Sequence, residues 1–134
     1  MQLLMWIPTF DGWIPIPAIL KPTPLWTGKQ ILSLILPKIN LEKVRAGLDS
    51  NEDPYCSLKD NKIVIQNGEL ICGVMCSKTV GKSQSGLIHI CMLEKGYEQT
   101  WVFMSSIQKL VNNWLVTFGH TVGVQDTIAQ TTVL

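Results

Sequence analysis

The clearest pattern of apolar and polar positions along the chain is a pair of β-rich runs in KIVIQNGELICGVMC. The two runs flank Asn67-Gly68, a dipeptide that favours the two-residue loop of a β-hairpin because both positions tolerate positive φ. The sequence therefore predicts that residues 62–66 and 69–76 pair as antiparallel strands.

Two helices are predicted after the hairpin. LIHICMLEKG ends at Gly96 and YEQTWVFMSSIQKLVNNWLVTFG ends at Gly119, and glycine is typical of the position just after a helix. Apolar residues of the second segment recur at helical spacing, which predicts one buried face. The members of this face are Trp101, Met104, Ile107, Leu110, Val111, Trp114 and Leu115.

The first 26 residues contain three tryptophans and five prolines. Proline restricts both its own backbone and that of the preceding residue to extended geometry, so this stretch is predicted to lie extended over a surface, held by its aromatic rings. TGKQILSLILP follows and is predicted as a short helix, with Thr27 as the N-cap and Pro37 as the stop. A strand remains an alternative because the apolar run is short.

Charged residues are concentrated in residues 38–61, which we expect to form a variable, solvated loop without chemistry of its own. The C-terminal HTVGVQDTIA is predicted as a strand or an irregular extension. The predicted fold is therefore a single α+β domain over residues 1–134. It has a Pro-rich extended N-terminal stretch, a short helix, an antiparallel β-hairpin, two helices and an extended C-terminal segment.

Composition indicates that part of the surface is covered. Hydrophobic residues make up 46% of the chain, charged residues make up 16%, and the mean hydropathy is +0.22. Soluble domains carry about 25% charged residues. The best apolar run, residues 31–36, is far shorter than the roughly 20 residues that span a membrane, and MQLLMWIP lacks the basic flank of a signal peptide. Burial against other protein is favoured over a membrane, and the net charge of +1 gives no bulk attraction for nucleic acid.

The cysteines do not predict a metal site. Cys72 and Cys76 would share one face of a strand, and a second ligand pair is missing, so Cys56, Cys72, Cys76 and Cys91 are expected to be reduced thiols.

Catalytic residues are not assignable either. His89 is expected to be a core or interface histidine, and His120 is expected to cap the end of a helix. Asp126 has no neighbouring carboxylate with which to hold metal ions. We therefore expect no catalytic residue and no metal ligand in this chain.

One segment is a candidate for binding. Lys78 and Lys82 are the only charged residues between Glu69 and Glu94, and they lie in a Gly/Ser-rich segment that leads into a predicted helix. Such a segment offers backbone N–H groups to a phosphate, although ordinary solvated lysines explain it equally well. The letters GKS are not a nucleotide-binding P-loop, because Cys76 occupies the position of a required glycine.

Six segments follow one another in an order that identifies a family: PAILKPTPLWTGKQILSLILP, NGELICGVMCSKTVG, GLIHI, EKG, IQKLVNNWL and GHTVGVQDTIA. They resemble the pore domain, called domain 3, of the largest subunit of eukaryotic DNA-directed RNA polymerase II. The resemblance runs from about Leu3 to Ala129 and is lost only in residues 38–61. The alternatives are the equivalent domain of an RNA polymerase III or viral subunit, a free-standing protein-interaction module, and a small nucleotide-binding enzyme suggested by GKS alone.

The resemblance implies a nuclear, multi-subunit, DNA-binding nucleotidyltransferase that acts in transcription. Its pore admits nucleoside triphosphates, accepts the 3′ end of backtracked RNA and gives access to a transcript-cleavage factor. The catalytic aspartates are absent from this sequence, so Mg²⁺ belongs to the intact polymerase and the chain alone should be inactive. The implied partners are other regions of the largest subunit, other polymerase subunits, RNA and the cleavage factor.

The resemblance implies roles for three sets of residues in this sequence. The RNA-facing pore loop corresponds to Lys78, Thr79, Gly81 and Lys82, with Ser77 where relatives often carry a lysine. A C-terminal motif retains Gly123 and Asp126, with Gln125 where relatives carry glycine. The central family motif is intact at Leu25, Trp26, Thr27, Gly28, Lys29 and Gln30.

Overall fold

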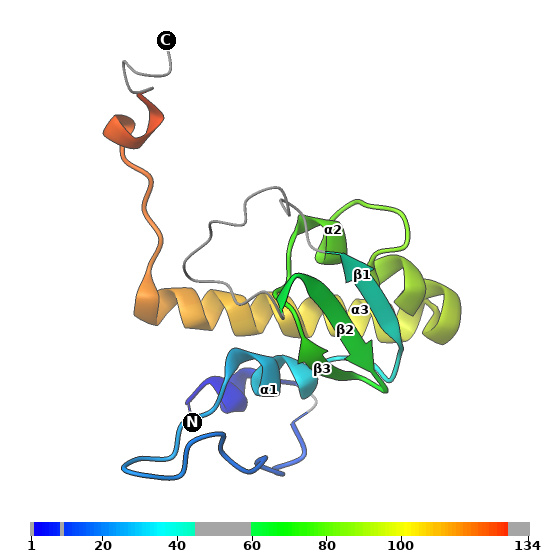
Figure 1. The fold of residues 1–134 in the computed structure, drawn as a ribbon, viewed down its shortest axis with the longest axis horizontal. Coiled ribbons are helices and arrows are strands. Elements are labelled where there is room, and N and C mark those ends of the chain that lie inside the picture. Colours follow the sequence, from blue (N-terminus) through cyan, green and yellow to red (C-terminus); the bar gives the residue numbers. More distant parts are fainter. Residues whose placement is uncertain (1, 9, 45–59, 129–134) are drawn as a thin grey trace.

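The computed structural model describes residues 2–8, 10–44 and 60–128, and it confirms the α+β fold. A small antiparallel sheet stands in front of one long helix in the view of Figure 1, and shorter helical segments lie around this pair. The elements are η1 (Gln2–Trp6), α1 (Gly28–Ser33), β1 (Leu41–Val44), β2 (Lys62–Gln66), β3 (Glu69–Cys72), α2 (Ser77–Val80), α3 (Leu87–Phe118) and η3 (Val124–Thr127).

The predicted hairpin is confirmed in β2 and β3. Asn67 and Gly68 have φ values of 49° and 84°, as a two-residue loop with positive φ at both positions requires. The second strand is shorter than predicted, because β3 ends at Cys72 and Gly73 turns the chain away with a φ of 96°. Cys72 and Cys76 therefore do not share a strand face, contrary to expectation.

A third strand, β1, completes the sheet in the order β1-β2-β3. It lies inside residues 38–61, so the expectation of a solvated loop is wrong at the start of this segment. Ile39 and Leu41 are buried, and Leu41 pairs with Ile65 of β2. The charges of Glu42 and Lys43 obscured this short apolar alternation. Residues 45–59, including Cys56, lie outside the described residues.

The helical prediction for the segment after Thr27 is confirmed, although α1 ends at Ser33, before Pro37. The N-terminal stretch contains no helix over residues 10–27, as predicted, but it differs from the prediction at its start. Its first residues form the 3₁₀ helix η1, and the buried anchors there are Leu4 and Ile7. Trp6 and Trp13 are exposed, so they do not hold this stretch in place.

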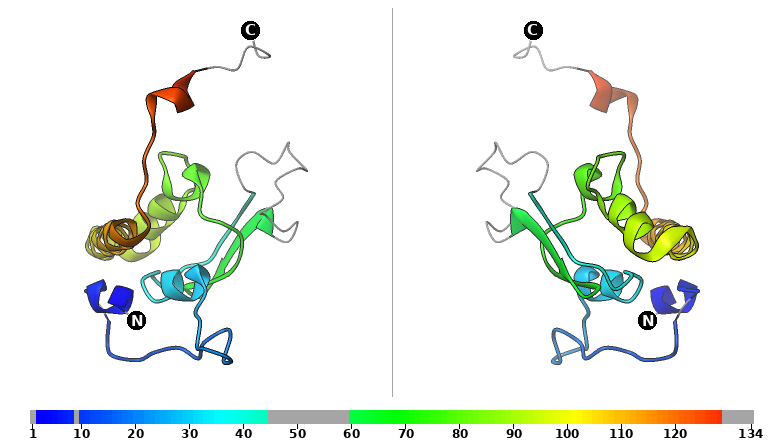
Figure 2. Two further views of the ribbon diagram at one scale, coloured as in Figure 1. Left: turned by 90° about the vertical axis from the view of Figure 1, so that its left-hand side faces the viewer. Right: turned by 90° about the vertical axis from the view of Figure 1, so that its right-hand side faces the viewer.

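Helix α3 contains both predicted helices, and the predicted boundary at Gly96 is confirmed. Gly96 has a non-helical φ of 82° and ψ of 178°, and the axis changes direction there (Figure 2). The predicted buried face is wrong in part. Trp101 is 69% exposed and Met104 is also exposed, whereas the buried side chains of the second half are Thr100, Phe103, Ser106 and Leu110.

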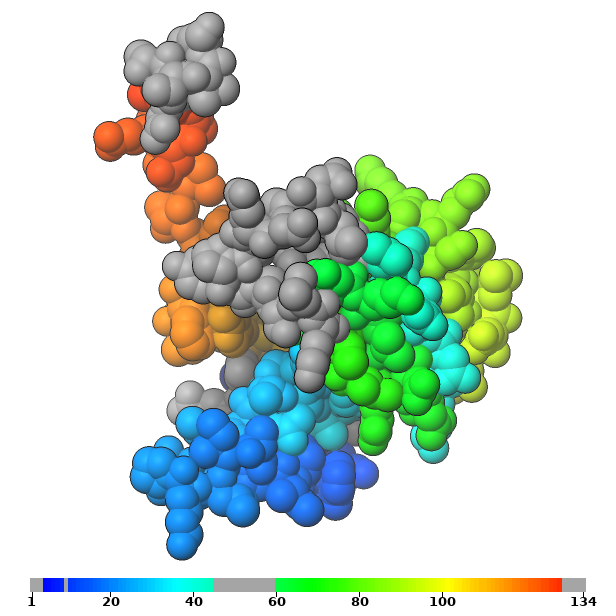
Figure 3. Space-filling view, in the orientation of Figure 1, coloured from blue at the N-terminus to red at the C-terminus, as the bar shows by residue number. Residues whose placement is uncertain are grey.

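Two apolar clusters hold these elements together. The larger packs the inner face of the sheet against α3, around Ile39, Ile63, Ile65, Leu87 and Phe103. The smaller joins η1 and the end of α1 to Leu110 of α3. Residues 119–128 leave this body and stand clear of it, as the orange-to-red surface in Figure 3 shows. None of the described helices is long and apolar enough to cross a membrane.

Candidate functional site

The Gly/Ser-rich segment between the hairpin and α3 begins with a helical turn rather than a loop. This turn, α2, contains Lys78 and Thr79 and is closed by N–H groups of Thr79 and Val80 that donate to the Cys76 carbonyl. Thr79 is fully buried, and its hydroxyl lies 3.4 Å from the Cys76 sulfur. The structure therefore gives Thr79 a packing role and does not support it as an RNA-facing residue.

Gly81 is required by close packing at the end of α2. Its N–H donates to the Ser77 carbonyl at 2.9 Å, and a Cβ added to Gly81 would lie only 2.1 Å from that oxygen. A larger residue would have to displace the turn that carries Lys78. Gly81 thus shapes the segment rather than contacting a ligand through a side chain.

The remaining loop, residues 81–86, is held by hydrogen bonds on both sides. The Ser83 hydroxyl donates to the carbonyl of Lys78, which ties the loop to α2. The Ser85 N–H donates to Nδ1 of His89 at 3.1 Å, which ties the loop to α3. His89 is exposed, so it is not a core histidine, and its ring accepts a hydrogen bond from the loop. The alternative of an interface histidine stays a prediction.

Two lysine side chains project from this segment, whose backbone is held by the hydrogen bonds just described. Lys78 and Lys82 are both exposed, and their ammonium groups have no hydrogen-bond or ion-pair partner within residues 2–8, 10–44 and 60–128. An unpaired lysine is a mobile point charge that attracts phosphate without reading a base. The arrangement suits contact with an anionic polymer.

A third lysine reaches the same loop from the sheet, and sequence reasoning missed it. Lys43 of β1 donates from Nζ to the Gln84 carbonyl at 2.9 Å and to the Ser83 hydroxyl at 3.2 Å. The sequence did contain one indication of this contact. Lys43 lies two residues after Leu41, so in a strand the two side chains lie on the same face of the sheet. The loop is therefore attached to β1, α2 and α3 together.

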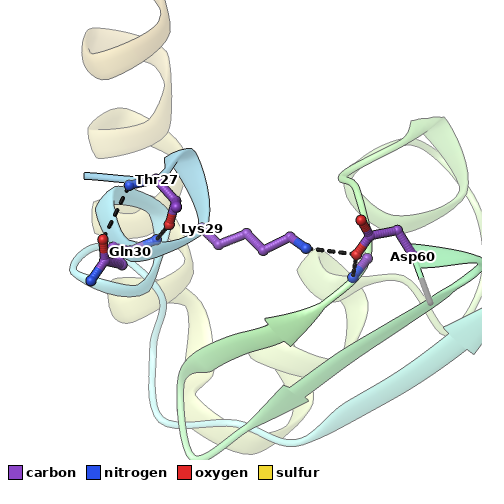
Figure 4. A network of polar contacts seen from close by, with 5 residues as sticks. Thr27, Lys29, Gln30 and Asp60 are labelled. Atoms are coloured by element: carbon purple, nitrogen blue, oxygen red, sulfur yellow. Dashed lines mark hydrogen bonds and ion pairs between the residues drawn. The ribbon is translucent and has the colours of Figure 1, made fainter. Parts of the chain in front are cut away.

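The polar side chains of the family motif at residues 25–30 have a structural role. Thr27 and Gln30 form a capping box at the start of α1, with the two hydrogen bonds at 3.3 and 3.1 Å (Figure 4). The amide of Gln30 also donates to the Ile16 carbonyl at 2.8 Å, and the Trp26 indole donates to the Pro15 carbonyl at 2.8 Å. These bonds attach the Pro-rich stretch to α1.

Lys29 extends this network to the sheet. Its ammonium group lies 2.6 Å from Asp60, and the same carboxylate oxygen accepts the Gly73 N–H at 2.8 Å (Figure 4). One carboxylate thereby joins α1, the start of β2 and the end of β3. Two other motif members make no side-chain hydrogen bond. Leu25 pairs with Ile19 through its backbone, and Gly28 has open space around it.

The C-terminal motif forms an exposed turn. Asp126 accepts the Gly123 N–H at 2.8 Å, and these two residues define the start of η3. His120 is exposed, and the expected hydrogen bond to a helix end is not found among the described residues. Likewise, no group of three or more His, Cys, Asp or Glu side chains in the described ranges could hold a metal ion.

The second half of α3 carries exposed apolar side chains beside its buried face. The stripe comprises Tyr97, Trp101, Met104, Val111 and Phe118, spaced three, four or seven residues apart. Next to it, a groove of about 340 Å³ lies between α1 and α3. Its lining residues are Trp26, Gly28, Ile31, Leu32, Leu110, Val111, Trp114 and Phe118, and the rings of Trp114 and Phe118 stack at 4.6 Å.

An exposed apolar stripe of this kind, on a domain with few charges, is typical of a building block that packs against other protein. Comparison with known proteins shows the family to which the chain belongs. Residues 1–127 match the family described as RNA polymerase Rpb1, domain 3, so the chain belongs to this family of domains from the largest subunit of RNA polymerase II.

One relative shows how the chain relates to a whole subunit. The chain is 39% identical over 134 residues to the DNA-directed RNA polymerase II subunit RPB1-B of Trypanosoma brucei brucei. This match covers 99% of the chain but 7% of the relative, so the chain spans a small part of the length of that subunit.

Proposed function

We propose that the chain acts as the pore domain of the largest subunit of a nuclear RNA polymerase II. In this role it forms part of the passage through which nucleoside triphosphates enter, and it contacts the 3′ end of RNA that is extruded during backtracking. Nucleotide addition belongs to the intact polymerase, whose Mg²⁺ and catalytic aspartates lie in other segments. The transcript-cleavage factor reaches the active centre through the same passage.

The observation that carries the RNA-binding part is the pair of exposed, unpaired lysines, one in α2 and one in the following loop, which is attached to β1, α2 and α3. Lys78 and Lys82 follow one another within five residues, and Ser83 and His89 limit the motion of the backbone between and after them. A positioned cation attracts phosphate without a large loss of chain entropy on binding. The contact should be independent of base sequence, because a lysine ammonium reads phosphate charge alone.

The apolar stripe on α3 supports the structural part of the proposal. Its side chains are exposed in the described residues, and the related subunit is many times longer than this chain. Other regions of the same subunit, or other polymerase subunits, would cover the stripe and the adjoining groove. Lys78 in α2 and Lys82 in the following loop lie at the opposite end of α3, and they would remain free to face the pore.

The test uses intact polymerase that carries Lys78→Ala and Lys82→Ala together. Backtracked complexes should be shorter-lived, and the dependence of their stability on salt should weaken by slightly under one unit of log–log slope per lost phosphate contact, on the order of 0.7–0.9. Elongation on an undamaged template should stay near normal. The matched control is Lys109→Ala, which removes an exposed lysine from the far half of α3. Unchanged stability of backtracked complexes in the double variant would leave the domain with an architectural role only.

A further inference from the structure

Lys43 occupies an unusual position for a charged residue. It pairs with Ile63, which is fully buried, and it follows Leu41 on the inner face of β1. The Lys43 side chain is half-buried, so acceptors for its ammonium group offset the cost of this partial burial. The Gln84 carbonyl and the Ser83 hydroxyl are those acceptors.

Both acceptors belong to the loop that presents the pore lysines. The Ser83 hydroxyl, which accepts from Lys43, donates in turn to the carbonyl of Lys78. A chain of hydrogen bonds therefore runs from β1 through Ser83 to the backbone of Lys78, and Lys82 lies directly before Ser83. Moving or removing the Lys43 ammonium group would free the loop on the side that faces the sheet.

From this arrangement we propose that Lys43 is a positioning residue, which holds the α2–α3 loop in the shape that presents Lys78 and Lys82 to RNA. The part of this inference that concerns RNA rests on the proposed function, whereas the part that concerns the loop does not. The Lys43 ammonium group is hydrogen-bonded to the loop, so the proposal gives it a role in positioning the loop and not in contacting RNA.

The first measurement is hydrogen exchange in intact polymerase carrying Lys43→Met, which keeps the apolar stem and removes the donor. Loss of one or two hydrogen bonds should speed amide exchange in residues 81–86 by about fivefold, with no change in β2 and β3. Ser83→Ala breaks the same chain in its middle and should give the same pattern. Lys62→Met is the matched control, because Lys62 lies on the neighbouring strand in an exposed ion pair with Glu42.

The second measurement is the lifetime of backtracked complexes in the same variants. Lys43→Met should shorten it by about twofold to fivefold, Lys43→Arg should restore most of the loss because it keeps donors, and Lys62→Met should have no effect. Adding Lys43→Met to the Lys78→Ala/Lys82→Ala double variant should shorten the lifetime no further, because Lys43 acts through those two residues.

The two measurements distinguish the positioning role of Lys43 from the proposed contact of Lys78 and Lys82 with RNA. Unchanged exchange in residues 81–86 would overturn the positioning role of Lys43. Faster exchange with a normal lifetime, in a polymerase whose lifetime does depend on Lys78 and Lys82, would overturn the link from Lys43 to RNA. Faster exchange together with no effect of the Lys78→Ala/Lys82→Ala variant would refute the proposed RNA contact and leave Lys43 as the support of the loop.

Discussion

At the residue scale, a few positions decide where the chain turns. Gly68 has a positive φ and is buried, and its N–H donates to the Ile39 carbonyl at 3.1 Å, so the hairpin loop packs directly on the segment that leads into β1. Asn67 and Gly68 were predictable because their dipeptide has a strong local preference. Burial of Thr79 was not predictable, since it depends on how α2 packs against the core.

The Gly68→Val substitution should lower the free energy of unfolding by on the order of 1–3 kcal/mol, because a β-branched residue is strained at positive φ. A Cβ at this position would also lie 3.0 Å from the Pro37 carbonyl oxygen. Thermal unfolding measures the change. Gly28→Ala is the control, since its Cβ meets open space at the start of α1, and it should not lower the midpoint. Equal midpoints for Gly68→Val and the unaltered protein would refute the turn assignment.

At the element scale, local signals predicted α1, the hairpin and the break at Gly96, and they failed for β1 and for the buried face of α3. The strand β1 is only four residues long and carries two charges, so its identity depends on pairing with β2. Helix α3 has two adjacent apolar stripes, and spacing alone does not show which one faces the sheet. Phe103 was overlooked for the same reason, although it is a member of the larger core cluster.

The link between α1 and the sheet can be tested by comparing two ion pairs. The Lys29–Asp60 pair has side chains 35% and 22% exposed, whereas Lys62–Glu42 has side chains 61% and 66% exposed. A double-mutant cycle with Lys29→Met and Asp60→Ala should give a coupling energy of about 0.5–2 kcal/mol. The cycle for Lys62→Met and Glu42→Ala should give less than about 0.5 kcal/mol, because exposed pairs are screened by water. Similar coupling in both cycles would show that the family motif does not join α1 to the sheet.

At the scale of the whole molecule, low charge and high apolar content predicted a covered surface, and the structure shows where apolar side chains gather. The stripe on α3 and the groove beside it lie on the second half of that helix, away from the lysine loop at its beginning. Composition could not locate the stripe, because its position depends on the rotation of α3 against the sheet. The approach of Lys43 to Ser83 was equally hidden, since 40 residues separate them in sequence.

The isolated domain should therefore bind a hydrophobic dye and self-associate as its concentration rises. Trp101→Gln should reduce both effects without loss of helical signal, because Trp101 is largely exposed and lies in the stripe. Dye fluorescence and sedimentation measure the change, and Lys109→Gln on an adjoining exposed position is the control. A monomeric fragment that binds no dye at high concentration would argue against a surface made for protein contact.

The central claim, that α2 and the loop after it face RNA in the polymerase pore, is tested most directly by photo-crosslinking. A photoreactive amino acid replaces Lys78 in the intact polymerase, and a matched variant carries it at Lys109. Complexes are then stalled either in the forward position or after backtracking. The account predicts a crosslink from position 78 to the extruded 3′ segment only in backtracked complexes, with none from position 109. Absence of that crosslink from position 78, in complexes whose backtracking is verified by transcript cleavage, would contradict the account.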